Sequence, residues 1–269
     1  GGSKVLNSFD RFNQLTQLPT TIPNAATLAM TSGKVDRVEH GPTGVHVWIG
    51  GRAHFVGKDE RGLALHEPLP NAGKIKDYKP WEPPSVGTYY EAGAPLSDPN
   101  RTWTNPHTFY EATKSMDRVQ NFLTDEMHGL YKSEGIRRRA IETMVKAMSN
   151  LTKIEDPGDH PHVLRGEFYP TSVIRRMNDD ELKGQRPIAH KPVLKGVDML
   201  PLSLTEDWMA KLQHQRLKET LMDAASKGHV SNIHGAHPIP GIAYGAELGQ
   251  PQLARPVPGR PFTVQPHHY

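Results

Sequence analysis

Residues 151–159 read LTKIEDPGD, a short apolar run that ends in an Asp-Pro-Gly-Asp turn, and they lie at the centre of the pattern that decides the fold. Proline fixes the backbone and glycine permits left-handed torsion angles, so the tetrapeptide predicts a tight turn. Three landmarks follow in order: KPVLKGVDMLPLSLTEDWM at 191–209, LQHQRLKETLMDAASKG at 212–228 and HGAHPIPGIAYG at 234–245.

Upstream of this stretch, helical spacing of apolar residues predicts two helices, one after Pro106 and one from Arg137 to Asn150. The first stripe ends at Gly135 and comprises Met116, Val119, Leu123, Met127 and Leu130; the second comprises Ile141, Met144, Val145 and Met148. Short strands are expected near 163–168 and 191–195. A capping box of Ser203 and Glu206 opens a last helix that closes at Lys227-Gly228.

The first hundred residues predict a helix over 3–18, stopped by Pro19, and then strands. The stripe of this helix comprises Val5, Leu6, Phe9, Phe12 and Leu15. Apolar and polar residues alternate at 33–38 and 45–49, and Gly50-Gly51 predicts a hairpin turn. The proline-rich intervals 79–84 and 93–106 are expected to be connecting loops that pack on a neighbour or stay mobile.

The chain is therefore predicted to be α+β and to consist of several small packed pieces. Its composition agrees, because 24 Gly, 24 Pro and only 36% hydrophobic residues disfavour one large globule. The absence of Cys excludes disulfides and thiolate metal sites, and no apolar run reaches the roughly 20 residues that span a bilayer. A net charge of +3 is compatible with nucleic acid and is also ordinary for a soluble protein.

The order and spacing of the landmarks resemble the C-terminal part of the β′ subunit of multisubunit DNA-dependent RNA polymerase. Upstream, GGSKVLNSFDRFNQL and PNAATLAMTSGKVDRVEHG extend the resemblance to residue 1. The chain departs from the family at Gln213-His214-Gln215 and at 241–245, which suggests a divergent member, such as one encoded by a large virus or bacteriophage.

The resemblance implies six segments. They are the second trigger-loop helix (1–19), a β-rich jaw-like region (20–105), a helical pair (106–150), a small β region (151–202), a switch-like helix (203–228), and a docking segment with a flexible tail (229–269). A start so close to a helix suggests a split point, a processing site or an artificial boundary near Gly1.

In that family the trigger hairpin folds against substrate, and a short helix at 3–18 is marginal enough to do so. An ordinary terminal helix packed by Phe9 and Phe12 is the alternative. The switch-like helix would touch template DNA, with candidate contacts from Lys211, His214, Gln215, Arg216 and Lys218. Arg137 is a further candidate, because Arg137-Arg138-Arg139 begins a helix, the unfavourable end for cations. Plain solvation is the alternative for each of these residues, and for Arg137 a carboxylate cluster on another subunit is a third possibility.

No Asp-rich loop suited to Mg²⁺ is present; Asp179-Asp180-Glu181 is expected to be a solvated turn. The resemblance thus implies a polymerase portion that supports catalysis, with Mg²⁺ held by another chain of the complex. The expected partners are β-like chains, the rest of β′, an ω-like subunit, DNA template and RNA, in the cytoplasm of the cell or, for a virus, of its host.

Two alternatives stay open. One is a non-enzymatic scaffold or nucleic-acid-binding module of polymerase-derived architecture. The other is a metal-dependent hydrolase, which would need a His and carboxylate cluster. His160, His162, His229, His234 and His237 lack the spacing of a zinc site and are better explained as loop polarity.

Overall fold

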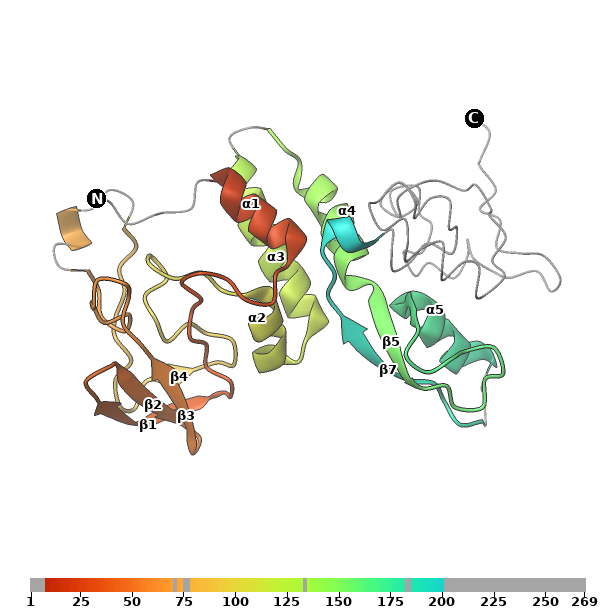
Figure 1. Cartoon of the computed structure of the whole chain (residues 1–269), viewed down its shortest axis with the longest axis horizontal. Helices are drawn as coiled ribbons and strands as arrows, with labels where there is room; N and C mark the ends of the chain where they lie inside the picture. Colours follow the sequence, from red (N-terminus) through yellow and green to blue (C-terminus); the bar gives the residue numbers. More distant parts are fainter. Residues whose placement is uncertain (1–7, 70–71, 75–77, 133–134, 182–184, 201–269) are drawn as a thin grey trace. The chain divides into compact units, whose positions relative to one another are not determined.

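The computed structural model describes residues 8–69, 72–74, 78–132, 135–181 and 185–200, and the chain divides into two compact units, 1–130 and 131–269 (Figure 1). The described part combines helices with two antiparallel sheets, which confirms the predicted α+β class. The switch-like helix and the tail lie outside the described residues.

The sheet of the first unit has the order β3-β2-β1-β4. Its strands are β1 (Gly33–His40), β2 (Val45–Ile49), β3 (Arg52–Val56) and β4 (Tyr89–Tyr90). The hairpin turn predicted at Gly50-Gly51 joins β2 to β3, and both glycines have positive φ, +56° and +77°, as a two-residue hairpin turn requires. One face of the sheet is a core lined by Ala29, Val35, Val45, Val47, Ile49, Val56 and Leu96.

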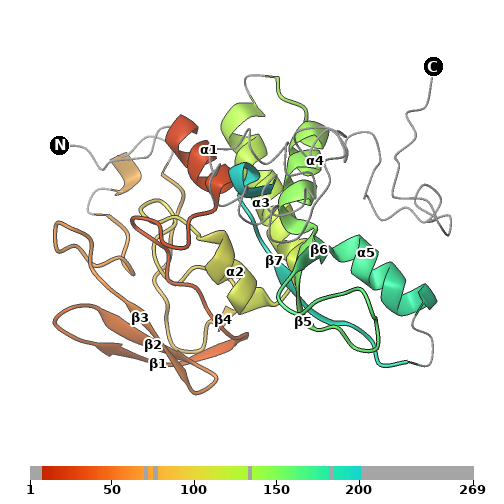
Figure 2. The same cartoon turned by 45° about the vertical axis from the view of Figure 1, so that its right-hand side comes forward.

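Helix α1 (Ser8–Gln17) lies beside α3 in both Figure 1 and Figure 2. It ends at Leu18, whose backbone is left-handed and whose N–H donates to the carbonyl of Gln14. Phe9 is 64% exposed, so the expectation that it packs the helix is wrong. Arg11 and Leu15 are buried instead, and Phe12 is only half-buried.

The proline-rich intervals predicted to be loops are indeed connections, and β4 lies between them. The second interval is pinned by backbone hydrogen bonds, since Ala29 donates to Ala94, Leu96 to Thr27 and Asp98 to Leu65. A short 3-10 turn, η1 (Ala72–Lys74), belongs to the loop after β3.

Two helices complete the first unit, α2 (Pro106–Thr113) and α3 (Met116–Tyr131). The side chain of Asn105 caps α2 by accepting a hydrogen bond from the N–H of His107, and Lys114 ends the helix in a left-handed conformation. The predicted stripe on α3 is buried at Val119, Leu123 and Met127.

The second unit contains α4 (Arg138–Ser149) and a three-stranded sheet with the order β6-β5-β7. The strands are β5 (Leu151–Asp156), β6 (Phe168–Pro170) and β7 (Ala189–Val193), and the helical turns are α5 (Thr171–Arg176), η3 (Met177–Glu181) and η4 (Val197–Met199). The predicted helix at 137–150 is present. A core of Ile154, Val163, Ile174 and Ile188 joins the sheet to α5.

The strand expected at 163–168 is wrong, because most of that stretch is a loop and only Phe168 enters β6. The strands that the sequence analysis did not predict include β5, the LTKIED run itself. The predicted turn at 156–159 is present, and Gly158 has φ +61° with its Cα so close to the carbonyl of Arg186 that a Cβ would lie 2.3 Å from that oxygen.

Candidate nucleic-acid interface

Of the predicted DNA contacts, the described residues include only Arg137. Lys211, His214, Gln215, Arg216 and Lys218 lie outside the described part, so the structure does not test them. Arg137 is the N-cap residue of α4, in an extended conformation and without a side-chain capping hydrogen bond.

The three arginines at the start of α4 are all exposed. Arg138 donates from Nε to the Glu142 carboxylate at 3.0 Å, one helical turn later, whereas the guanidinium groups of Arg137 and Arg139 have no ion pair or hydrogen bond among the described residues. The opposite side of α4 is buried through Ile141, Val145 and Met148, so the helix is held and its first turn presents cations outward.

The carboxylates of the 156–159 turn are engaged by one arginine. Arg186 lies 3.5 Å from Asp156 and 3.8 Å from Asp159, and its guanidinium also donates to the carbonyl of Gly158 at 3.2 Å. Its backbone N–H donates to Asp159 as well, at 2.8 Å. The turn therefore uses its acidic side chains to hold the loop before β7 rather than to bind a metal ion.

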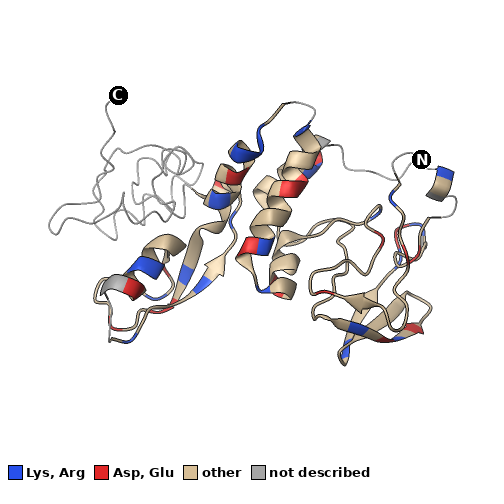
Figure 3. Cartoon of the chain, turned by 180° about the vertical axis from the view of Figure 1, so that it is seen from behind, with Lys and Arg blue, Asp and Glu red and all other residues tan. Residues whose placement is uncertain are grey.

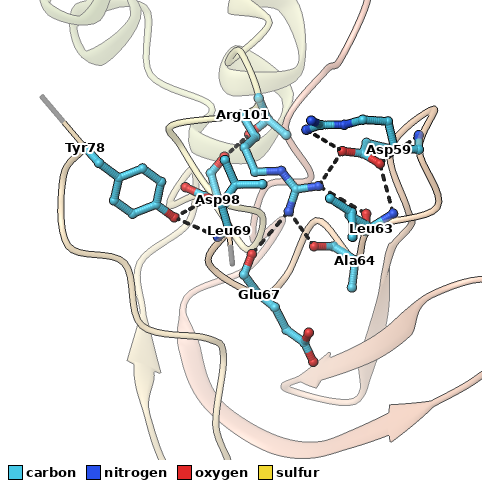
Figure 4. Close-up of polar contacts among 10 residues, drawn as sticks. Asp59, Leu63, Ala64, Glu67, Leu69, Tyr78, Asp98 and Arg101 are labelled. Atoms are coloured by element: carbon cyan, nitrogen blue, oxygen red, sulfur yellow. Dashed lines mark hydrogen bonds and ion pairs between the residues drawn. The ribbon is translucent and has the colours of Figure 1, made fainter. Parts of the chain in front are cut away.

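A second arginine organises the first unit. Figure 4 shows Arg101 between the loop after β3 and the segment before α2. Its guanidinium donates to the carbonyls of Ala64, Leu63 and Glu67 and pairs with the Asp59 carboxylate at 2.7 Å. Only 5% of the Arg101 side chain is exposed.

Asp59 is stabilised as a carboxylate by its surroundings. Burial by itself would raise its pKa, but the N–H groups of Leu63 and Arg61 and the guanidinium of Arg101 outweigh burial and lower it. Next to this pair, Tyr78 donates its hydroxyl to Asp98 at 2.6 Å (Figure 4), and burial together with that carboxylate raises the pKa of Tyr78. This network fixes loops; it does not resemble a catalytic pair open to substrate.

A third arginine attaches α1 to the rest of the first unit. Arg11 is 1% exposed and its guanidinium lies 3.2 Å from the Glu126 carboxylate on α3 and 4.7 Å from the centre of the Trp103 ring. It also donates to the side chain of Gln14. Burial lowers the pKa of Arg11, and Glu126 opposes that shift. Sequence reasoning missed this residue because it lies outside the predicted apolar stripe, where an arginine normally faces water.

The described residues contain no group of three or more His, Asp or Glu side chains placed to hold a metal ion. His160 and His162 lie near each other, with ring centres 6.1 Å apart, but no carboxylate joins them. Asp179 is exposed in η3, where a solvated turn was expected; the side chains after it are outside what the structure describes. In that same part of the chain, each helix is too short or too polar to cross a membrane.

No protein-family model matches the chain. Curated relatives do match it, and each is named as the DNA-directed RNA polymerase subunit beta′. That of Thermus aquaticus is 28% identical over 218 residues, 79% of this chain and 13% of its own length. Those of Thermus thermophilus and Caldicellulosiruptor saccharolyticus are 31% and 33% identical over 152 residues, 55% of this chain and 10% and 13% of theirs.

The chain thus spans about an eighth of the length of the curated relatives that it matches. The longest of these alignments exceeds either unit, because 218 residues are more than the 139 of the second unit. The resemblance predicted from the order of the sequence motifs is therefore confirmed: this chain is similar to the β′ subunit of DNA-directed RNA polymerase.

Proposed function

We propose that this chain is the C-terminal portion of a β′ subunit and that it supports template-directed RNA synthesis within a multisubunit polymerase. The observation that carries the proposal is the similarity over 79% of the chain to subunits of that name. A share of about an eighth of the relatives' length implies that the remaining parts of such an enzyme, the Mg²⁺-binding aspartates included, belong to other chains or segments.

The finer roles follow from the same resemblance. In this proposal α1 is the second arm of the trigger hairpin, the first sheet belongs to a jaw-like region, and residues 203–228 form the switch-like helix that grips DNA. The buried Arg11 supports a role in which α1 stays packed against α3. Its ion pair with Glu126 holds one side of the helix, while Phe9 remains exposed. Residues 229–245 would dock on a small ω-like subunit.

A native pull-down of this chain tests the proposal, followed by mass spectrometry of the recovered partners and a template-dependent RNA synthesis assay. The expected result is co-purification with a β-like subunit and with a chain that bears an Asp-rich Mg²⁺ loop, and RNA made by the eluate. A folded chain that elutes alone and makes no RNA would instead support the scaffold or binding-module alternative.

A further inference from the structure

One face of the β6-β5-β7 sheet carries a row of basic and aromatic side chains. Lys153 of β5 is directly opposite Phe168 of β6 and directly opposite Lys191 of β7. Opposed residues on antiparallel strands project to the same face. Lys195 reaches this face too, since its Nζ lies 5.1 Å from the centre of the Phe168 ring. We refer to these four residues as the lysine face.

The other face of the sheet holds the core. Ile154, the residue after Lys153, packs with Ile174 of α5 and with Val163 and Ile188. Thr152, on the other side of Lys153, is fully buried and its hydroxyl lies 2.8 Å from Nδ1 of His190. The pleat therefore directs Lys153 away from the apolar core of this unit.

The lysine face lacks its own counter-charges within the described part of the chain. Lys153 and Lys191 are exposed, and neither ammonium group has an ion pair or hydrogen bond there. Like charges directly opposite each other destabilise an antiparallel pair. The acidic residues of these strands and beside them are Asp156, which pairs with Arg186; Glu155, exposed at the bulge of β5; and Glu167, which accepts a hydrogen bond from Tyr169.

In the same unit Arg138 and Arg186 have carboxylate partners, whereas Arg137 and Arg139, like the two lysines, have none among the described residues. Figure 3 shows basic positions side by side on its adjoining strands. Such an arrangement costs stability in the isolated unit and is compensated when an anion binds across the two strands.

We propose that the lysine face binds the phosphate backbone of a nucleic acid. The inference deepens the proposed polymerase role, on which it rests for the identity of the strand, and it assigns a DNA contact to residues other than 203–228. Ammonium groups neutralise phosphates without reading bases, and interleaved basic and aromatic side chains are typical of nucleic-acid grooves. The lysines alone would also suit an acidic polypeptide, and Phe168 adds a ring beside them on which a base can stack, which favours a nucleic acid.

The test measures fluorescence anisotropy of labelled DNA, duplex or single-stranded, titrated with the whole chain across a salt series. Each phosphate contact contributes about 0.9 to the slope of log K against log salt on duplex DNA. The double variant Lys153→Gln/Lys191→Gln is expected to lower that slope by about 2 and to weaken binding roughly tenfold at low salt. A larger effect on single strands than on duplex would assign the face to an unpaired strand.

The matched control is Lys34→Gln/Lys79→Gln, which removes the same charge from two exposed lysines of the first unit and is expected to leave the slope unchanged. Lys153→Arg/Lys191→Arg should restore binding, and circular dichroism checks that each variant is folded. No binding by the unaltered chain, or equal slopes for all variants, would overturn the proposal.

Competition with polyglutamate distinguishes a nucleic acid from an acidic protein as the ligand of the lysine face. If the Lys153→Gln/Lys191→Gln variant loses polyglutamate binding and keeps its DNA binding, the face serves an acidic protein and the proposal is wrong. The polymerase role is judged independently, by the pull-down. If the chain is recovered with polymerase subunits but its DNA binding does not depend on these lysines, only the proposal for the lysine face is wrong.

Discussion

The two sheets of this chain differ in whether opposed or neighbouring charged side chains on the solvent-facing side have a partner within the chain. On the outer side of the first sheet, Arg37 pairs with Glu39 at 3.1 Å, and its guanidinium lies over the ring of Trp48, 4.2 Å from its centre. On the lysine face of the second sheet, Lys153 and Lys191 oppose each other across the strands without a carboxylate partner among the described residues. Arg37 of the first sheet is thus paired within the chain, whereas the two opposed lysines of the second sheet are left for a ligand.

The loops beside the two sheets differ in burial as well. Arg101 ties the loop after β3 from a position that is 5% exposed, whereas Arg186 ties the 156–159 turn from a side chain that is 62% exposed. An ion pair in water contributes little, while removal of one partner from a buried pair leaves an uncompensated charge. The first unit is therefore expected to be the more sensitive to loss of a single arginine.

The largest expected effect comes from Arg101→Ala. The variant loses the ion pair with Asp59 and three hydrogen bonds to backbone carbonyls. The expected decrease in the free energy of unfolding is about 3–5 kcal/mol, measured by urea denaturation followed by circular dichroism.

Arg61→Ala is the matched control, because Arg61 pairs with the same Asp59 oxygen at 3.3 Å but is 50% exposed. Its expected cost is below about 1 kcal/mol. Equal losses for the two variants would contradict the role given to burial.

The next effect concerns DNA retention. Replacing both Lys211 and Arg216 by Ala in the assembled enzyme is expected to lower the salt slope of DNA binding by about 2, with roughly tenfold weaker binding. Combining these changes with Lys153→Gln/Lys191→Gln should add to the loss, since each pair of residues is proposed to neutralise its own phosphates. An unchanged slope in the Lys211→Ala/Arg216→Ala enzyme would remove the switch-like helix from the DNA contacts.

The sequence predicted those parts of the fold that depend on local pattern. The hairpin at Gly50-Gly51 and helix α4 follow from turn chemistry and helical spacing, and both are present. The strand LTKIED was missed because it has no clean alternation: Leu151 and Thr152 are both buried, and a bulge follows at Glu155. Val163 was assigned to a strand, yet it reaches the core from a loop.

The lysine face and the Arg11–Glu126 contact were less predictable, because each depends on contacts between residues far apart in the sequence. Lys153 and Lys191 are 38 residues apart, and only the register of β5 with β7 places them opposite each other. Arg11 and Glu126 meet by tertiary packing in the same way. Sequence alone identified Arg137 as an exposed cation at a helix start, since that property is local.

A smaller effect is expected from pH, again in the first sheet. His54 is buried in β3, where its Nε2 accepts from the N–H of Met30 at 2.9 Å and its Nδ1 lies 3.2 Å from the carbonyl of Val47. Both contacts suit the neutral ring with the proton on Nδ1. Burial lowers the pKa of His54, and the charge of Arg52 lowers it further.

Because the folded pKa of His54 lies below the unfolded value of about 6.5, the unfolded chain binds the proton more readily. Its contribution to stability is fully present above that pH and is lost as the pH falls below it. His54→Gln should flatten the dependence of the urea midpoint on pH between about 7.5 and 5.5. Some slope should remain, since burial also lowers the pKa of His66 and of His190. An equally steep slope in the variant would contradict the neutral assignment.

The smallest effect sharpens the contrast between the two sheets. Lys191→Glu places a carboxylate directly opposite Lys153, so it replaces a repulsive cross-strand pair by an attractive one. The isolated chain should gain about 0.5 kcal/mol in free energy of unfolding, whereas Lys34→Glu, opposite Tyr89, should give no such gain. The same Lys191→Glu change should weaken DNA binding. Higher stability together with weaker binding would mean that the unpaired lysines lower the stability of the fold and contribute to binding the ligand. A variant that is less stable but binds DNA as before would show that Lys191 has only a structural role in the sheet.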